Sequence, residues 1–188
     1  MGAADAGGEL KHGAGQLNPA RARDPGLVYD ATEGDYVEML CAQGYNATQL
    51  AAITGSNDTA CGAASDSSVA DLNYPTMAAH VAPGERFALR FPRTVTNVGA
   101  PAAVYDAKVV AVRTDAAAAN MNVTVDPSRL EFSPQFRSMS FTVKVSGVVA
   151  AANEVASVAV VWTDGEHEVR SPVVVYTVDV DAPEGGST

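Results

Sequence analysis

The sequence has little positive charge, few aromatic side chains and only two cysteines. Twelve lysines and arginines face 22 aspartates and glutamates among 188 residues, which gives a net charge of −10. This surplus of negative charge argues against binding to nucleic-acid phosphates or to an anionic membrane surface. No apolar run approaches the roughly 18 residues needed to cross a bilayer. We therefore expect neither a nucleic-acid partner nor a membrane partner.

Motifs for catalysis and for metal binding are also missing. Neither G-x-S-x-G nor H-E-x-x-H occurs, and two cysteines are too few for a cysteine-based zinc site. None of the three histidines, His12, His80 and His167, stands in a recognisable nucleophile motif. His167 lies between Glu166 and Glu168 beside a predicted turn, so we expect it to be solvated. We predict no catalytic residue, no metal ligand and no cofactor in this chain.

The two cysteines and three sequons form a second group of candidate sites. Cys41 and Cys61 are either a disulfide pair, or a buried free thiol and an incidental cysteine. The N-x-[ST] triplets begin at Asn46, Asn57 and Asn122. Three triplets in a short chain favour a secreted, N-glycosylated parent protein, although each asparagine is equally compatible with an ordinary loop residue. The residues alone leave these alternatives open.

The first third of the sequence predicts two short helices. Thr32 is suited to cap the first helix and Gly44 to end it. The second runs from about Thr48 to Ile53 and ends before Gly55. Two helices of this length bury little surface by themselves, so we interpret this stretch as part of a larger body.

After about residue 70 the sequence has the two-residue period of β-strands. Apolar residues alternate with polar ones between Met139 and Ser146, which predicts a half-buried strand. Two further apolar runs flank Asp164-Gly165, which predicts a hairpin with a two-residue turn in which both residues have positive φ. Pro172 in the second run predicts a bulge or a sheet edge. About seven or eight short strands over roughly 110 residues predict a mainly β immunoglobulin- or fibronectin-like sandwich.

Several ordered motifs resemble one protein family, the plant subtilisin-like serine proteases of the cucumisin-like group. Residues 13–19 (GAGQLNP) and 24–30 (DPGLVYD) are similar to the end of the family's peptidase domain. Residues 71–76 (DLNYPT) and 93–99 (RTVTNVG) are similar to its C-terminal fibronectin type III-like domain. The resemblance covers about Gly13 to Val175, most of the chain.

The resemblance implies a division of the chain and a role. Residues 1–66 would be the incomplete end of a subtilisin-like α/β peptidase domain, 67–180 a fibronectin type III-like sandwich, and 181–188 a tail. Without a neighbouring peptidase domain, we expect Leu27, Val28 and Tyr29 to be exposed. Cys41 and Cys61 correspond in position to a family disulfide, and the sandwich would support an upstream peptidase domain, its expected partner.

Activity and location follow from the same resemblance. The family's Asp, His and Ser triad would precede residue 13, and its G-T-S-M-A-x-P serine motif does not occur in this sequence. The parent would hydrolyse peptide bonds in the extracellular space, whereas this chain alone is predicted to be inactive. If translated from Met1 without a signal peptide, it would stay in the cytosol. The alternative is a stand-alone, non-enzymatic interaction or cell-wall-associated sandwich, and the sequence defines neither substrate specificity nor oligomeric state.

Overall fold

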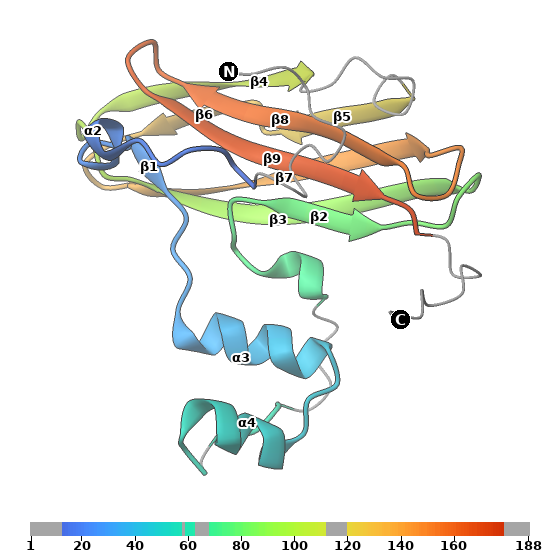
Figure 1. Cartoon of the computed structure of the whole chain (residues 1–188). Helices are drawn as coiled ribbons and strands as arrows, with labels where there is room; N and C mark the ends of the chain where they lie inside the picture. The colour runs from blue at the N-terminus through green and yellow to red at the C-terminus, as the bar shows by residue number, and fades with distance from the viewer. Residues whose placement is uncertain (1–12, 58, 63–67, 112–119, 179–188) are drawn as a thin grey trace.

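The computed structural model describes residues 13–57, 59–62, 68–111 and 120–178. They form a two-layered β-sandwich from which a pair of helices projects (Figure 1). The predicted tail, 181–188, and His12 lie outside this part of the chain. The strands are β1 (Leu27–Val28), β2 (Met77–His80), β3 (Arg86–Asn97), β4 (Ala103–Ala111), β5 (Met121–Asp126), β6 (Arg129–Phe132), β7 (Ser138–Val148), β8 (Val155–Thr163) and β9 (Glu168–Tyr176). The helices are α2 (Pro19–Ala22), α3 (Glu33–Ala42), α4 (Ala47–Thr54) and the 3-10 helix η1 (Val69–Asp71).

Two sheets make up the sandwich. One has the strand order β1-β3-β7-β5, and the other has the order β2-β9-β8-β4-β6. Neighbouring strands are antiparallel, except that β2 runs parallel to β9. The prediction of a mainly β, fibronectin-like sandwich is therefore confirmed.

The core between the sheets is built from the alternating side chains that the sequence predicted. Phe141, Val143 and Val145 on β7 are at most 3% exposed, while polar residues between them face away from the core. The Phe141 ring meets the ring of Trp162, from the opposite sheet, edge-on with 5.0 Å between centroids. Burial of such large apolar side chains is the main favourable contribution to folding.

The β8–β9 connection differs from the predicted turn. Thr163 lies opposite Glu168, so four residues, 164–167, connect the two strands. The Asp164 Oδ1 atom accepts hydrogen bonds from the backbone N–H groups of Glu166 (2.9 Å) and His167 (2.6 Å). Gly165 has a φ of +97°, but Asp164 does not have a positive φ. The two-residue prediction was wrong because this side chain folds the loop locally, as aspartates commonly do in turns.

Pro172 lies where the sheet tolerates a missing N–H group. It faces Ala159 of β8 on one side. On its other side, β2 pairs with β9 only from Val173 to Tyr176. Pro172 therefore occupies a stretch of β9 with an open edge among the described strands, in agreement with the predicted edge position.

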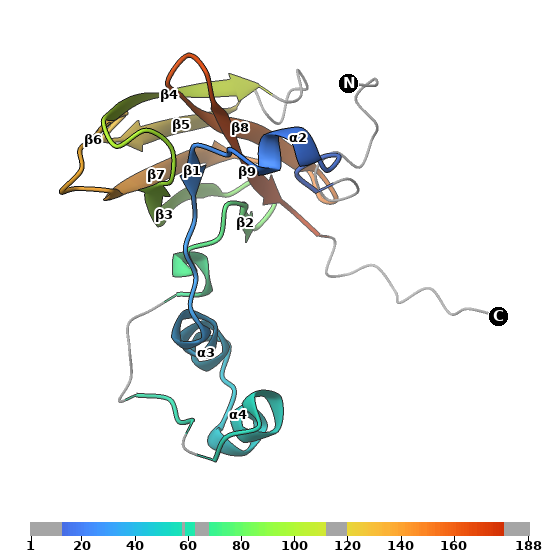
Figure 2. The same ribbon diagram turned by 90° about the vertical axis from the view of Figure 1, so that its left-hand side faces the viewer.

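Helices α3 and α4 form a hairpin below the sandwich, connected to it by two chain segments (Figure 2). Thr32 caps α3 in a reciprocal capping box with Asp35, as its position before the helix predicted. Gly55 ends α4 with a φ of +71°. Only Leu50 is buried in these two helices, and α3 has no buried residue.

Candidate functional site

The segment 24–30, which we call the strap, joins the helical hairpin to the sandwich. Its central residues form β1, in which Leu27 pairs with Asn97 and Val28 with Thr96 of β3. The Leu27 side chain is 3% exposed and belongs to the core of the sandwich. The expectation that Leu27, Val28 and Tyr29 would be exposed was therefore wrong: Leu27 is buried and the other two are half-buried, because the strap is an edge strand of this sandwich.

Gly26 lets the strap approach the loop between β8 and β9. It has a φ of +75°, and a Cβ atom there would lie 2.5 Å from the Tyr105 hydroxyl and 2.9 Å from the His167 Cβ. A larger residue would collide with both side chains and would be strained in its backbone.

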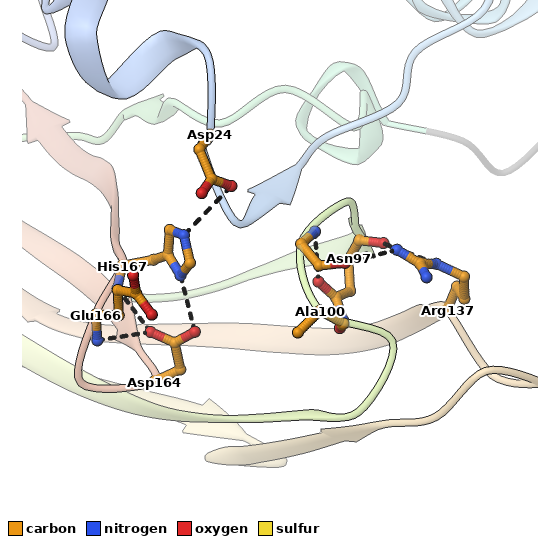
Figure 3. A network of polar contacts seen from close by, with 8 residues as sticks. Asp24, Asn97, Ala100, Arg137, Asp164, Glu166 and His167 are labelled. Atoms are coloured by element: carbon orange, nitrogen blue, oxygen red, sulfur yellow. Dashed lines mark hydrogen bonds and ion pairs between the residues drawn. The ribbon is translucent and has the colours of Figure 1, made fainter.

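His167 joins the start of the strap to this loop (Figure 3). Its Nδ1 atom lies 2.9 Å from Asp164 Oδ2, and its Nε2 atom lies 3.4 Å from Asp24 Oδ1. The side chain is 15% exposed, so the prediction of a solvated histidine was wrong. The hydrogen bond to Asp164 outweighs burial and, together with Asp24, raises the pKa of His167.

Asp164 is the second ionisable group at the point where the start of the strap meets the β8–β9 loop. Its burial opposes ionisation, but hydrogen bonds from the backbone and side chain of His167 and from the Glu166 backbone outweigh burial and lower the pKa of Asp164. Burial, followed by a hydrogen bond to Asp164, raises the pKa of the Tyr105 hydroxyl. Asp164 thus stays ionised and accepts hydrogen bonds from the groups that pack around the strap.

Asn97 shapes the β3–β4 turn against which the strap lies (Figure 3). Its amide nitrogen donates to the Ala100 carbonyl at 2.7 Å, and its Oδ1 accepts from the Gly99 N–H at 3.0 Å. The Arg137 guanidinium donates to the Asn97 carbonyl from Nε at 3.0 Å. In this turn the Val98 N–H reaches the Gly26 carbonyl at 2.9 Å, which extends the pairing of the strap beyond β1.

The far end of the strap is held by side chains. The Tyr29 hydroxyl lies 2.7 Å from Ser171 Oγ on β9, and the Tyr29 ring meets the Phe141 ring edge-on at 6.5 Å. Burial is the main cause of a raised pKa for Tyr29. The Thr96 hydroxyl donates to Asp30 Oδ2 at 2.5 Å. These contacts fix the point at which the chain leaves the sandwich for α3.

The chain returns to the sandwich through residues 70–74, which we call the return segment. The Asn73 amide nitrogen donates to the carbonyls of Asp30 (2.8 Å) and Thr94 (2.9 Å). The Thr94 N–H donates to Asn73 Oδ1 at 2.8 Å. The side-chain amide thus pairs with Thr94 as a neighbouring strand would, and it connects the return segment to the strap.

Arg93 holds the return segment from inside the sandwich. It is 4% exposed, and its Nε donates to the Tyr74 carbonyl at 2.8 Å. Its Nη1 donates to the carbonyls of Ala70 and Pro92, each at 2.7 Å. Burial is the main cause that lowers the pKa of Arg93 to about 10. Sequence reasoning identified Arg93 only as part of a family motif and did not identify its role.

The predicted disulfide and glycosylation candidates lie apart from the strap. The Cys41 and Cys61 sulfurs are 2.05 Å apart, which ties the end of α3 to the segment after α4. Asn46 caps α4, Asn57 is exposed after that helix, and Asn122 is exposed on β5. Use of these asparagines as glycan acceptors stays a prediction.

Among the described residues, no three side chains of histidine, cysteine, aspartate or glutamate are grouped as metal ligands would be. Within the same ranges, no helix has the length and apolar character needed to cross a membrane. His80 packs its ring against Tyr176 with 5.6 Å between ring centroids.

Comparison with known proteins places these features in a family. The sequence profile of the fibronectin type-III domain matches residues 71–175. Subtilisin-like protease SBT4.3 of Arabidopsis thaliana is 41% identical over 170 residues, which are 90% of this chain and 22% of that protein. Subtilisin-like protease SBT4.9 of the same plant is 41% identical over 180 residues, or 95% of this chain and 24% of that protein. The chain therefore spans about a quarter of the length of these relatives.

Solved structures give a weaker likeness. The Vibrio cholerae VesB protease matches 55% of this chain and 30% of its own chain, with 12% sequence identity and a TM-score of 0.39. The sequence matches are the informative ones, since they extend from the strap through both sheets. The chain belongs to the fibronectin type-III domain family and, over about nine tenths of its length, matches a portion of the plant subtilisin-like proteases.

Proposed function

We propose that this chain is the supporting C-terminal part of an extracellular subtilisin-like serine endopeptidase. In this role the sandwich anchors the polypeptide that comes from an upstream peptidase domain, and that domain would hydrolyse the peptide bonds. The observation that carries the proposal is the 41% identity to SBT4.3 over 90% of this chain but only 22% of that protease.

The strap and the return segment give this role a physical basis. The chain leaves the sandwich at Asp30 and comes back at Ala70, where Arg93 holds it, and Asn73 of the return segment donates to the Asp30 carbonyl of the strap. A helical hairpin held at two neighbouring points has a restricted position relative to the sandwich. Anything that packs on the hairpin would be oriented by the same contacts.

The helical hairpin offers apolar surface to a neighbour. Ile53 is 57% exposed and Tyr36 is 42% exposed, whereas α3 contributes no buried residue. Two short helices with so little buried surface gain stability by packing against another body. We assign that body to the upstream peptidase domain, which the relatives' greater length accommodates.

The cysteine pair supports an extracellular location for the parent. Disulfides persist in oxidising compartments and are rare in the cytosol. The Cys41–Cys61 bridge closes a loop with a sequence separation of 20 residues, beside two helices in which only Leu50 is buried. We propose that the bridge forms during secretion and holds α3 and α4 together.

A chimeric protease tests the proposal. The peptidase portion of SBT4.3 would be joined to this chain in place of its matching segment, and secretion and peptide hydrolysis would be measured. We expect an active chimera whose secretion and activity fall when Asn73→Ala is introduced, while Lys108→Ala, an exposed control on β4, has no effect. An inactive chimera, or equal activity with Asn73→Ala, would contradict the supporting role.

A second experiment concerns the chain by itself. We expect no hydrolysis of a fluorogenic peptide and no labelling of any serine by a serine-directed covalent probe. Labelling of a serine would overturn the assignment of catalysis to an upstream domain.

One observation favours a different function, a stand-alone interaction module. The sandwich has its own core, with Trp162, Tyr105 and Phe91 each at most 1% exposed. A domain with such a core can fold without a partner. The coding region upstream of Met1 separates the two functions: a reading frame that continues into G-T-S-M-A supports the protease, and an upstream stop codon with a promoter supports the module.

A further inference from the structure

Asn122 occupies a different structural setting from the other two sequon asparagines. It lies on β5, which is the last strand of the four-stranded sheet. Asn122 and Thr124 are both exposed on the outer face of this strand, while Val123 between them packs against the core. Alternation along the strand therefore presents the acceptor amide and the sequon hydroxyl on the same side.

The surroundings of Asn122 leave room for a large substituent. Its cross-strand neighbour is Ser146, and that of Thr124 is Lys144, whose ammonium pairs with Asp126 at 2.9 Å. Within the described part of the chain, the Asn122 side chain makes no hydrogen bond that a glycan would have to break. A substituent on its amide would extend into solvent over the outer face of the sheet.

The other two sequons are engaged in local structure. Asn46 Oδ1 accepts the Gln49 N–H at 3.0 Å and caps α4. In the Asn57 sequon, the Thr59 hydroxyl lies 3.0 Å from the Thr54 hydroxyl. Asn122 is thus the sequon whose amide and hydroxyl both lack such a role among the described residues.

The edge beside Asn122 has few features that prevent pairing with another chain. Strand β5 pairs with β7 on one side, and no described strand lies on the other. Its first five residues, Met-Asn-Val-Thr-Val, carry no charge and include no proline. Open strands of this composition pair readily with other strands, and proteins usually block them with charge, proline or a covering group.

We infer that Asn122 is an N-glycosylation site whose glycan covers the open β5 edge and keeps the sandwich from self-associating. This inference rests on the secretion proposed above. A lipid-pyrophosphate-linked oligosaccharide is the co-reactant. A bond forms between Asn122 Nδ2 and the anomeric carbon of the first sugar, the bond from that carbon to the phosphate oxygen breaks, Nδ2 loses one proton, and the lipid pyrophosphate leaves.

Mass analysis tests the site. The full chain would be secreted from eukaryotic cells behind an added leader, so the result does not depend on a peptidase partner. We expect a glycan on Asn122 in the wild type and in Thr124→Ser, which keeps the sequon, and none in Asn122→Gln or Thr124→Ala. An unmodified Asn122 in the secreted wild type would overturn the site, while the chimera experiment would still decide the supporting role.

Light scattering on the same samples tests whether the glycan prevents self-association. Enzymatic removal of the glycan from the folded wild type should convert a monomer into larger species, so this result does not depend on whether a variant folds. Asn122→Gln should behave like the deglycosylated protein, and Asn46→Gln should remain monomeric. A deglycosylated wild type that stays monomeric at the same concentration would overturn the covering role.

Discussion

The sandwich and the helical hairpin of this chain are stabilised in different ways. The sandwich buries large side chains from both sheets, among them Trp162, Phe141 and Phe91. The hairpin buries Leu50 alone and depends on capping boxes at Thr32 and Asn46 and on a disulfide. Burial scales with apolar area, whereas caps contribute about 1 kcal/mol each.

This difference indicates which residues belong to the sandwich. Residues 24–30 precede the hairpin in the sequence, yet Leu27 lies in the core of the sandwich. The hairpin is therefore an excursion between two segments that both belong to the sandwich. The same arrangement would suit a domain that must hold a neighbour at a fixed position.

A core substitution should have the largest effect on the free energy of unfolding, and an effect of this size should be found only in the sandwich. We expect Trp162→Ala to lower the free energy of unfolding by about 3–5 kcal/mol, because its fully buried ring contacts Phe141. Ile53→Ala, on the exposed face of the hairpin, should change it by less than about 0.5 kcal/mol. Denaturant unfolding measures both, and equal effects would contradict the contrast between the regions.

Loss of the disulfide should act on the hairpin alone. Replacing Cys41 and Cys61 by serine together removes a loop closure for which chain entropy predicts about 3 kcal/mol. We expect faster hydrogen exchange at Leu50 and unchanged exchange at Val143. A matching loss of protection in β7 would mean that the two regions unfold as one unit.

Removing the Arg93 side-chain donors should loosen the return segment. Arg93→Met leaves the carbonyls of Ala70 and Tyr74 without their donor, which costs about 1–3 kcal/mol. Arg90→Met, an exposed arginine on the same strand, is the matched control and should be nearly neutral. Thermal unfolding of the two variants gives the comparison, and an equal shift in Tm would show that the buried hydrogen bonds contribute little.

The smallest expected effect is a pH dependence at the start of the strap. The pKa of His167 is raised in the folded state, so its stabilisation is complete below the unfolded pKa, about 6.5, and is lost as pH rises through the folded pKa. We expect the free energy of unfolding to fall by about 1 kcal/mol or less between about pH 5.5 and 8.5.

Asp164 gives a separate pH dependence, which lies below this range and has the opposite sign. Its pKa is lowered on folding, so its contribution is present above the unfolded value of about 3.9 and is lost as pH falls through the folded pKa. His167→Gln should abolish the change between about pH 5.5 and 8.5 without altering the core. Unfolding curves with the same pH dependence in the wild type and in His167→Gln would contradict the role of this histidine.

The sequence predicted those features that depend on neighbouring residues. The alternation along β7 and the cap at Thr32 are local patterns, and both were found in the structure. The Asp164-Gly165 turn was also local but was predicted wrongly, since the dipeptide pattern takes no account of the Asp164 side-chain hydrogen bonds.

The strap contacts depend on residues far apart in the chain. Asn73 bonds to groups 43 and 21 residues away, and no periodicity or motif indicates such partners. Likewise, β1 has two residues, which are too few for a strand pattern. The residues next to His167 in the sequence give no sign that Asp24 lies beside its ring. Gly26 offered the one local signal, because a glycine after Pro25 suggests an unusual backbone or a close approach.

The most direct test of the central claim is hydrogen exchange at the strap. The Val98 N–H donates to the Gly26 carbonyl, so its protection reports whether the strap is docked on the sandwich. We predict protection of the Val98 amide that approaches that of Val143 and clearly exceeds that of Leu50. Exchange at Val98 as fast as in the hairpin would contradict the assignment of the strap to the sandwich.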